Sequence, residues 1–282
     1  MNEWRAEVAQ QRKAGRSWTE IARLLRDTFP ELTETQIRDK AKDAFRVKTR
    51  QKVYGVFSDI HAPFTHPNFL KFLQDTFRRE RVTDIICLGD LVDNHAISRF
   101  NSEPSAKGAY DELDRAIDII ERYTTAFPKV RMIKGNHDLI AYRQAATLGI
   151  GKRFIKDFRD IYGLPKGWKV NEDENDDGEL LIDGVLYKHG LNCTGKDGAL
   201  NTAIQERMST VIGHSHAFGG CKYSANKRNI IFGMNVGCGI DINAYAFAYG
   251  KHAKNRPTLG CGIVYGNDRA QFIPMGAEYF RD

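Results

Sequence analysis

The sequence lacks long apolar runs and paired cysteines, and each absence excludes a class of protein. None of its apolar stretches approaches the length of a membrane-spanning helix, so we expect no membrane contact. No apolar segment follows the first residues, which argues against a secretory signal and favours a cytoplasmic protein. The five cysteines are scattered and form no Cys-x-x-Cys pair, so we expect reduced core thiols rather than a disulfide framework or a zinc knuckle.

The sequence also lacks internal repeats and low-complexity tracts, and its composition is that of an ordinary globular protein. Its 282 residues suffice for one large domain and a small appendage. The net charge of +6 is concentrated in residues 1–50, which hold 12 of the 42 basic residues but only 8 of the 36 acidic ones. Such a basic segment either attracts a polyanion, for example nucleic acid, or simply keeps the protein in solution.

The N-terminal segment reads as three short helices. The first covers about residues 3–13. The second begins at Ser17, whose spacing to Glu20 predicts reciprocal capping of the first turn, and Thr33 and Gln36 repeat this spacing ahead of a third helix. Apolar residues at helical spacing predict the buried faces of the last two helices: Ile21, Leu24, Leu25 and Phe29, then Ile37, Ala41 and Phe45.

Basic residues crowd the third helix and its exit, among them Arg38, Lys42 and Arg46. The segment from Gly15 to Lys42 resembles helix-turn-helix DNA-binding domains, in which the corresponding helix lies in the major groove. The resemblance implies that residues 1–50 form a small DNA-binding domain and that these three side chains contact DNA. Three-helix units also serve as protein-contact modules, and this alternative stays open.

From residue 52 onward short apolar strands run into polar, glycine-rich turns and alternate with helices, which predicts an α/β core in residues 51–282. We expect strands at residues 52–57, 84–88, 130–134 and 210–212, and helices near residues 68–80, 107–127 and 136–146. Residues 180–187 read as a hairpin with Asp-Gly at the turn, and residues 229–236 and 262–273 are strand-rich. The acidic run at residues 171–178 lacks the ligand spacing of an EF-hand and is expected to be a solvated loop.

Potential metal ligands follow the strands in five clusters. In chain order these are Asp59 with His61, then Asp90, then Asn136 with His137 and Asp138, then His189, and finally His214 with His216. Carboxylate, imidazole and amide oxygen donors together suit borderline divalent ions such as Mn, Fe, Zn or Ni. The other histidines, His66, His95 and His252, lie outside the clusters and are expected to be surface or packing residues.

The motifs Asp-x-His, Gly-Asp-x-x-Asp, Gly-Asn-His-Asp, His and Gly-His-x-His occur in this order, and over about residues 52–275 the chain resembles the calcineurin-like metallophosphoesterases. The resemblance implies a β-sandwich flanked by helices, with two divalent metal ions, Mn being the first choice. It also implies the ligand sets: Asp59, His61 and His216 for one ion, Asn136, His189 and His214 for the other, and Asp90 as the bridge.

Two ions a few ångströms apart can clamp a phosphate and lower the pKa of a bridging water, so that hydroxide attacks in line. The resemblance makes His137 the residue that steadies the phosphate and protonates the leaving oxygen, with Asp93 fixing its orientation. The alternative for Asp93 is a loop cap.

The substrate is less closely defined. Phosphoprotein phosphatases of the superfamily usually carry Arg after Gly-Asp-x-x-Asp and Glu at the end of the third motif, where this chain has Asn94 and Asp138. Loss of the Arg removes a bidentate phosphate clamp, and Gly-Asn-His-Asp is frequent in nuclease and phosphodiesterase branches. The stretch from Gly89 to Phe100 also resembles phosphoesterases encoded by phages and prophages, and Arg99 within it is either a phosphate contact or an ordinary surface residue.

Three hypotheses follow. The first is a phosphodiesterase or nuclease acting on DNA or a nucleotide, delivered by the basic N-terminal segment. The second is a phosphomonoesterase acting on proteins or small molecules. The third is a non-enzymatic DNA-binding regulator with a relic site, against which the complete ligand set argues. The fold cannot decide between substrates, because one metal scaffold serves many.

Overall fold

The computed structural model describes residues 3–49, 52–98, 108–171, 178–193, 195–244 and 256–280. They belong to two units, Met1–Gln51 and Lys52–Asp282, each with a hydrophobic core of its own. In the described part of the chain, no helix combines the length and the hydrophobicity that crossing a bilayer would require.

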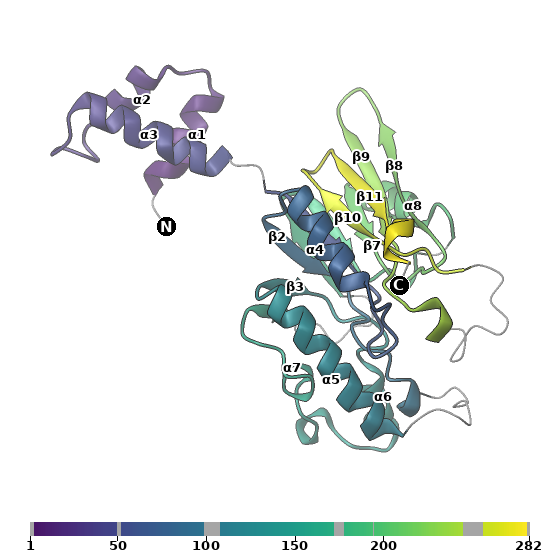
Figure 1. The fold of residues 1–282 in the computed structure, drawn as a ribbon. Coiled ribbons are helices and arrows are strands. Elements are labelled where there is room, and N and C mark those ends of the chain that lie inside the picture. The colour runs from purple at the N-terminus through teal and green to yellow at the C-terminus, as the bar shows by residue number, and fades with distance from the viewer. Residues whose placement is uncertain are drawn as a thin grey trace. The chain divides into compact units, whose positions relative to one another are not determined.

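The described part of the N-terminal unit forms three helices, α1 (Glu3–Lys13), α2 (Trp18–Leu24) and α3 (Glu34–Thr49) (Figure 1). The expected capping pairs are present. The Ser17 side chain accepts the Glu20 N–H at 3.3 Å, and Glu20 accepts the Ser17 N–H at 2.7 Å. Thr33 and Gln36 form the same reciprocal pair ahead of α3.

Two expectations for this unit are wrong in detail. Helix α2 ends at Leu24, before Phe29, the last residue of its expected apolar face. Leu24 is 46% exposed because Ile21 and Leu25, four residues apart, turn toward the core. The connection at residues 25–33 is longer than the turn of about three or four residues in most helix-turn-helix motifs. The fully buried core residues are Val8, Ile21, Ala22, Leu25, Ile37 and Ala41.

The described residues of the larger unit form two β-sheets. The first has the strand order β11-β10-β1-β2-β3-β4, in which β1 to β4 run parallel and β10 pairs antiparallel with β1 and β11. Its strands are β1 (Tyr54–Phe57), β2 (Asp84–Cys87), β3 (Val130–Met132), β4 (Trp168–Val170), β10 (Gly260–Val264) and β11 (Ala270–Pro274).

The second sheet has the order β5-β6-β7-β9-β8, with a parallel centre and antiparallel edges. Its strands are β5 (Glu179–Ile182), β6 (Val185–Lys188), β7 (Ser209–Ile212), β8 (Gly219–Ala225) and β9 (Ile230–Val236). The hairpin between β5 and β6 turns at Asp183 and Gly184, both with positive φ, as the Asp-Gly pair predicts.

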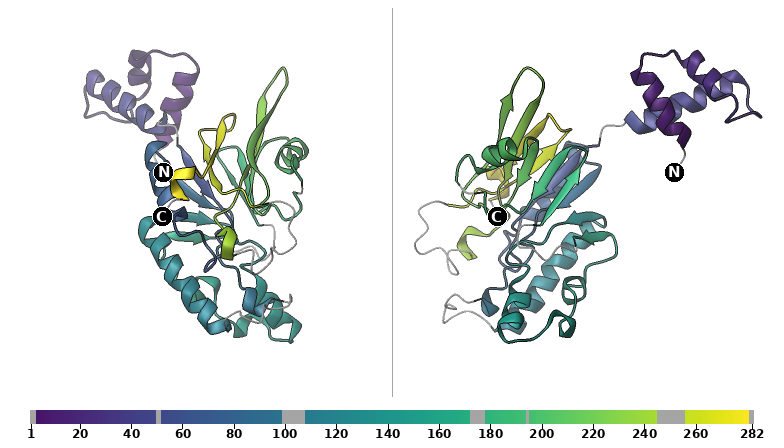
Figure 2. Two further views of the ribbon diagram at one scale, coloured as in Figure 1. Left: turned by 45° about the vertical axis from the view of Figure 1, so that its right-hand side comes forward. Right: turned by 180° about the vertical axis from the view of Figure 1, so that it is seen from behind.

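The sheets pack face to face as a sandwich with helices outside. In β1, Tyr54 and Val56 enter the core between the sheets, whereas Phe57 points into the core beneath α4 (Phe69–Arg79) and α5 (Ala109–Ala126). Those two helices lie on one side of the sandwich, and α8 (Gly198–Glu206) lies on the other (Figure 2). The predicted α/β fold, a β-sandwich flanked by helices, is confirmed.

Several short elements complete this unit. They are α6 (Ile140–Thr147), α7 (Phe158–Ile161) and the 3-10 turns η1 (His95–Ile97), η2 (Lys152–Phe154) and η4 (Ala277–Tyr279). Helix α6 begins four residues later than expected, because residues 136–139 form a turn that carries site residues. The elements β4, β8, α7 and α8 have no counterpart in the sequence-based expectations. The acidic residues 172–177 lie outside the described residues.

All five cysteines are reduced, and all except Cys221 are buried. Burial raises the pKa of the Cys87, Cys238 and Cys261 thiols, so these side chains stay protonated and pack as small apolar groups. The expectation of reduced core thiols is confirmed for these positions.

Candidate metal centre

The ligand clusters expected from the sequence converge at one edge of the sandwich. Asp59 and Asp90 follow β1 and β2, which are parallel neighbours, and Asn136 follows β3. His189 and His214 follow β6 and β7, the corresponding neighbours of the second sheet. Main-chain hydrogen bonds join the loop after β1 to the loop after β2, and the loop after β6 to the loop after β7.

The first cluster consists of Asp59, His61, Asp90 and His216. His216 Nε2 lies 3.1 Å from Asp59 Oδ1 and 3.2 Å from His61 Nε2, and His61 Nε2 lies 3.7 Å from Asp90 Oδ2. The other ring nitrogen of His61 donates to Asp93 Oδ1 at 2.6 Å, which directs its Nε2 lone pair into the cluster. Imidazole nitrogens and carboxylate oxygens directed at one point fit a divalent cation.

The second cluster contains Asp90, His189 and His214, with Asn136 beside them. His189 donates its Nδ1–H to the carbonyl oxygen of Leu88 at 2.9 Å, so Nε2 carries the lone pair. This Nε2 lies 2.9 Å from Asn136 Oδ1 and 3.3 Å from Asp90 Oδ2. When the His189 ring is neutral, three acceptor atoms face one another, and a cation among them, a proton or a metal ion, would relieve their repulsion.

Asp90 belongs to both clusters and is only 1% exposed. Its Oδ1 accepts the main-chain N–H of His137 at 2.7 Å, but its Oδ2 accepts no hydrogen bond from the described residues. A buried carboxylate oxygen without a partner is unfavourable, and a cation in each cluster would supply the missing interactions. The buried donor set therefore fits two divalent metal ions.

The buried carboxylates of the clusters favour bound cations, as the pKa shifts of their neighbours indicate. Burial alone would lower the pKa of His189, but the Asp90 carboxylate outweighs it and raises that pKa to about 10. Burial likewise would raise the pKa of Asp59, yet hydrogen bonds with His216 and His61 hold it well below its ordinary value. His189 therefore binds a proton readily, and a metal ion must displace that proton.

The backbone of this edge is strained. Asp59, His61, Asp90 and His214 have φ values of 54°, 47°, 48° and 61°, a left-handed region that residues with side chains rarely adopt. Gly135 is required for a different reason, because a Cβ at this position would lie 2.3 Å from Asp90 Oδ1. Such outliers cluster at functional sites, where the surrounding contacts fix the conformation.

His137 lies beside the clusters and keeps 17% of its side chain exposed, whereas His61 and His189 are fully buried. Its Nδ1 donates to the carbonyl oxygen of Asp93 at 2.7 Å, and its ring packs edge-on against His61 with centroids 4.6 Å apart. Asp93 therefore contacts two imidazoles. Its carboxylate holds the ring of His61, and its main chain holds the ring of His137, whereas the sequence pattern suggested His137 alone.

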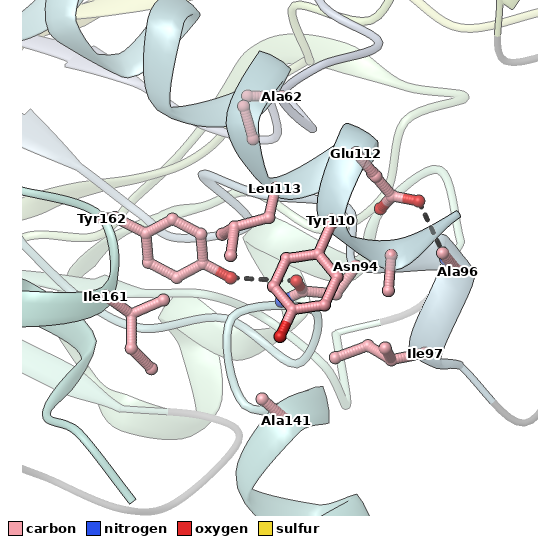
Figure 3. A pocket seen from close by; sticks show the side chains of 12 residues that line it. Ala62, Asn94, Ala96, Ile97, Tyr110, Glu112, Leu113, Ala141, Ile161 and Tyr162 are labelled. Carbon is pink, nitrogen blue, oxygen red and sulfur yellow. Dashed lines mark hydrogen bonds between the residues drawn. The ribbon is translucent and has the colours of Figure 1, made fainter. Parts of the chain in front are cut away.

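Asn94 has both ends of its amide engaged. Its Nδ2 donates to the carbonyl oxygen of His137 at 3.0 Å, and its Oδ1 accepts the Tyr162 hydroxyl at 2.9 Å. Asn94 and Tyr162 border a mainly apolar cavity of about 240 Å³, in which the Tyr162 hydroxyl points at Asn94 and the Tyr110 ring lies across the lining (Figure 3). The Asn94 side chain thus braces the His137 loop.

Two buried carboxylates that shape the site have no role in the sequence-based interpretation. Asp138 accepts three main-chain N–H groups, at 2.8–3.2 Å, and so joins the loops after β2 and β3. Glu112 of α5 accepts two N–H groups at the start of η1. Burial raises the pKa of both, that of Asp138 to about 7. Asp138 could have been found as the end of Gly-Asn-His-Asp, but no local signal marks Glu112.

The remaining candidates lie apart from the clusters. His95 is buried, and the His66 ring packs against Phe280, as expected for packing residues. Arg99 and His252 lie outside the described residues.

The proposed DNA-contact residues are on α3 of the other unit. Arg38 and Lys42 lie 3.7 and 3.5 Å from the carboxylate of Asp39, and about a third of each side chain is exposed (38% and 34%). The Arg46 side chain lies outside the described residues. Asp39 therefore offsets part of the positive charge on this face of the helix.

Residues 53–232 match the family of calcineurin-like phosphoesterases. No curated protein matches the sequence. Similar solved structures include a single mutant of Vps29 from Entamoeba histolytica, with 13% identity, coverage of 79% of this chain and 99% of that chain, and a TM-score of 0.35.

Two further similar structures are the phosphoesterase Yfce from E. coli (15% identity, 75% and 87% coverage, TM-score 0.35) and a dimetal phosphatase from Danio rerio (12% identity, 79% and 96% coverage, TM-score 0.37). The family match spans more than half of the chain and includes every residue of the two clusters. With that match and an intact set of buried His and Asp ligands, the protein is a metal-dependent phosphoesterase and belongs to the calcineurin-like phosphoesterases.

Proposed function

We propose that this phosphoesterase cleaves phosphodiester bonds of nucleic acid. The observation that carries the proposal is the environment of Asn94, at the position where phosphoprotein phosphatases of the superfamily carry Arg. Its amide is engaged with the His137 carbonyl and the Tyr162 hydroxyl. This position therefore supplies no guanidinium group to bind a terminal phosphate, which carries one more negative charge than a phosphodiester. A phosphodiester carries one negative charge less and does not need that clamp.

The ligand assignment follows the two clusters. One ion would be held by Asp59, His61 and His216, the other by Asn136, His189 and His214, and Asp90 would serve both. The bound ions would polarise the phosphate and supply a nucleophile at neutral pH. Mn is our first choice, with Fe, Zn or Ni as alternatives, because the donors are nitrogen and oxygen without thiolate.

His137 is the proposed proton donor to the leaving oxygen. The hydrogen bond from its Nδ1 to the Asp93 carbonyl fixes the ring, so Nε2 is the nitrogen that can exchange a proton with substrate. Asp93 acts by positioning, because its carboxylate is bonded to the ligand His61 and its carbonyl to His137.

The N-terminal unit is the proposed DNA-binding domain, with Arg38, Lys42 and Arg46 as phosphate contacts and residues 51–282 as the catalytic domain. Binding through phosphates should weaken steeply as salt rises, because each contact releases counterions. Lys42→Glu together with Arg46→Glu should abolish the salt-sensitive binding of duplex DNA by this unit and leave turnover of a nitrophenyl ester near wild type. Unchanged DNA affinity in this variant would instead favour a protein-contact module.

A substrate panel tests the proposal directly. With Mn, we expect turnover of bis-p-nitrophenyl phosphate and of DNA to exceed turnover of p-nitrophenyl phosphate and of a phosphopeptide. The reverse order would establish the phosphomonoesterase hypothesis. His137→Ala, measured on every substrate, controls for contaminating phosphatases, because activity from this site should fall on all of them together.

A further inference from the structure

A second cavity adjoins the metal centre on the side of α6. Its volume is about 790 Å³, and its lining comes from Lys134 after β3, from one face of α6, from residues 149–159 and from the end of β4. Two of the lining residues reach the catalytic loop. Lys134 directly precedes Gly135 and Asn136 in the chain, and Arg143 of α6 donates to the carbonyl oxygen of the candidate ligand Asn136 at 2.5 Å.

The surroundings of this cavity are strongly basic. Residues 141–159, which carry α6 and the connection to α7, contain five basic side chains and a single acidic one. They are Arg143, Lys152, Arg153, Lys156, Arg159 and Asp157. Arg159 is engaged in the fold, because its guanidinium donates to the carbonyl oxygens of Pro165 and Trp168. Arg143 and Lys152 line the cavity, and Arg153 and Lys156 lie on the connection after α6, so these four cations give this face a positive potential whatever hydrogen bonds they make.

The same connection exposes large apolar side chains. Leu148 is 77% exposed, Ile150 is 43% exposed and Phe154 is 86% exposed. Burying such groups is favourable, so three of them within seven residues mark a contact surface rather than ordinary exposure. Phe154 directly follows Lys152 and Arg153, which places an aromatic ring among cations.

We propose that this face, formed by α6 and residues 148–156, binds a single-stranded segment of the nucleic-acid substrate beside the cleavage site. Interleaved cations and aromatic rings are how proteins bind single strands, because the cations contact the backbone and the rings stack on exposed bases. Arg143, Lys152 and Arg153 would contact phosphates and Phe154 would stack on a base. A duplex keeps its bases stacked and could not use the ring. The inference rests on the proposed function, since it specifies the strand state of the same substrate.

The test compares three full-length variants with wild type on a single-stranded 20-mer, on the corresponding duplex and on bis-p-nitrophenyl phosphate. Phe154→Ala should raise KM for the single strand on the order of tenfold, because one stacking contact is lost. Phe154→Trp should restore it. Lys152→Ala with Arg153→Ala should lower the slope of log Kd against log salt by about 1.4, for two phosphate contacts on a single strand. Ester turnover should stay within about twofold of wild type in all of them.

Lys227→Ala with Arg228→Ala, two exposed cations in the β8–β9 hairpin, is the matched control and should leave the KM and the salt slope unchanged. Binding is measured by fluorescence anisotropy in a His137→Ala background, so that the oligonucleotide stays intact. Cleavage of the single strand by wild type, together with Phe154 and Lys152–Arg153 variants that behave like the control, would overturn this inference but leave the proposed function standing. That result would favour a partner protein as the ligand of this face. If wild type neither binds nor cleaves nucleic acid, the proposed function fails and this inference with it. Loss of ester turnover in the variants would show that these side chains maintain the structure of the metal centre, and it would also overturn the inference.

Discussion

Replacing Asp90 by Asn should separate the metal-binding role of this carboxylate from its role in the fold. Its Oδ1 accepts the His137 N–H at 2.7 Å, and the oxygen of an Asn amide can keep that bond. The amide NH₂ then takes the place of Oδ2, 3.3 Å from the Nε2 lone pair of His189, to which it can donate. Asp90→Asn should therefore fold normally but present no negative charge to either ion.

The expected loss of affinity is large because this carboxylate borders both clusters. A pair of unit charges about 4 Å apart is worth about 4 kcal/mol at an effective dielectric constant of about 20. That free energy corresponds to roughly 10³ in a binding constant. We therefore expect the affinity of both sites for Mn to fall on the order of 10³, and phosphodiester turnover to fall with metal occupancy.

Isothermal titration of chelator-treated protein with Mn, followed by elemental analysis, measures the effect. Asp84→Asn is the control, because it makes the same substitution on β2 at a carboxylate paired with Arg131 outside the clusters. Thermal unfolding of the chelated proteins checks that Asp90→Asn is folded. Two tightly bound Mn ions per Asp90→Asn chain, at wild-type affinity, would refute the bridging assignment.

Three further predictions concern the same centre. His137→Ala should keep metal content near wild type and lower turnover by a factor on the order of 10²–10⁴; an empty site in elemental analysis of this variant would make His137 a ligand. His189→Ala should lose metal and activity together, and retention of two ions would contradict the assignment of its Nε2. In chelated protein the pKa of His189 is raised above the unfolded value of 6.5 to about 10. Its contribution to stability is therefore present below about pH 6.5 and is lost as pH rises through about 10. The melting temperature of chelated protein should fall between pH 7 and pH 10 more than that of Mn-loaded protein, and parallel curves for the two would show that metal and protons do not compete at this site.

The sequence revealed the ligand positions because each follows a strand within a short motif. Asp59 and Asn136 each follow a strand of the same parallel sheet, and such strands end at the same edge. The β-α-β pattern of the sequence is enough to predict that these strands are parallel. The start of α6 could not be predicted, because Asp138 fixes the preceding turn through hydrogen bonds that include two N–H groups of the loop after β2. Strand β8 could not be predicted either, because its sequence is polar and lacks apolar alternation. It forms a strand because it pairs with β9.

The atoms that hold the loops differ from the atoms that face the clusters. Asp90 uses Oδ1 for the His137 N–H and turns Oδ2 to the histidines. His189 uses Nδ1 for the Leu88 carbonyl and turns Nε2 inward. His61 divides its two nitrogens in the same way between Asp93 and the cluster.

Two-ended ligands of this kind explain how a strained backbone can persist at Asp59, His61, Asp90 and His214, where each outlier costs on the order of 1–3 kcal/mol. The outer contact of each ligand ties it to a neighbouring segment of the chain, so the loops are positioned by bonds that a metal ion does not use. Metal exchange should then change the protonation of the inner atoms more than the path of the chain. A substitution that keeps the outer bond, such as Asp90→Asn, reports on metal binding, whereas one that removes both ends, such as His189→Ala, also releases the loop. The two classes of variant should therefore differ in the stability of the chelated protein even where both lose activity.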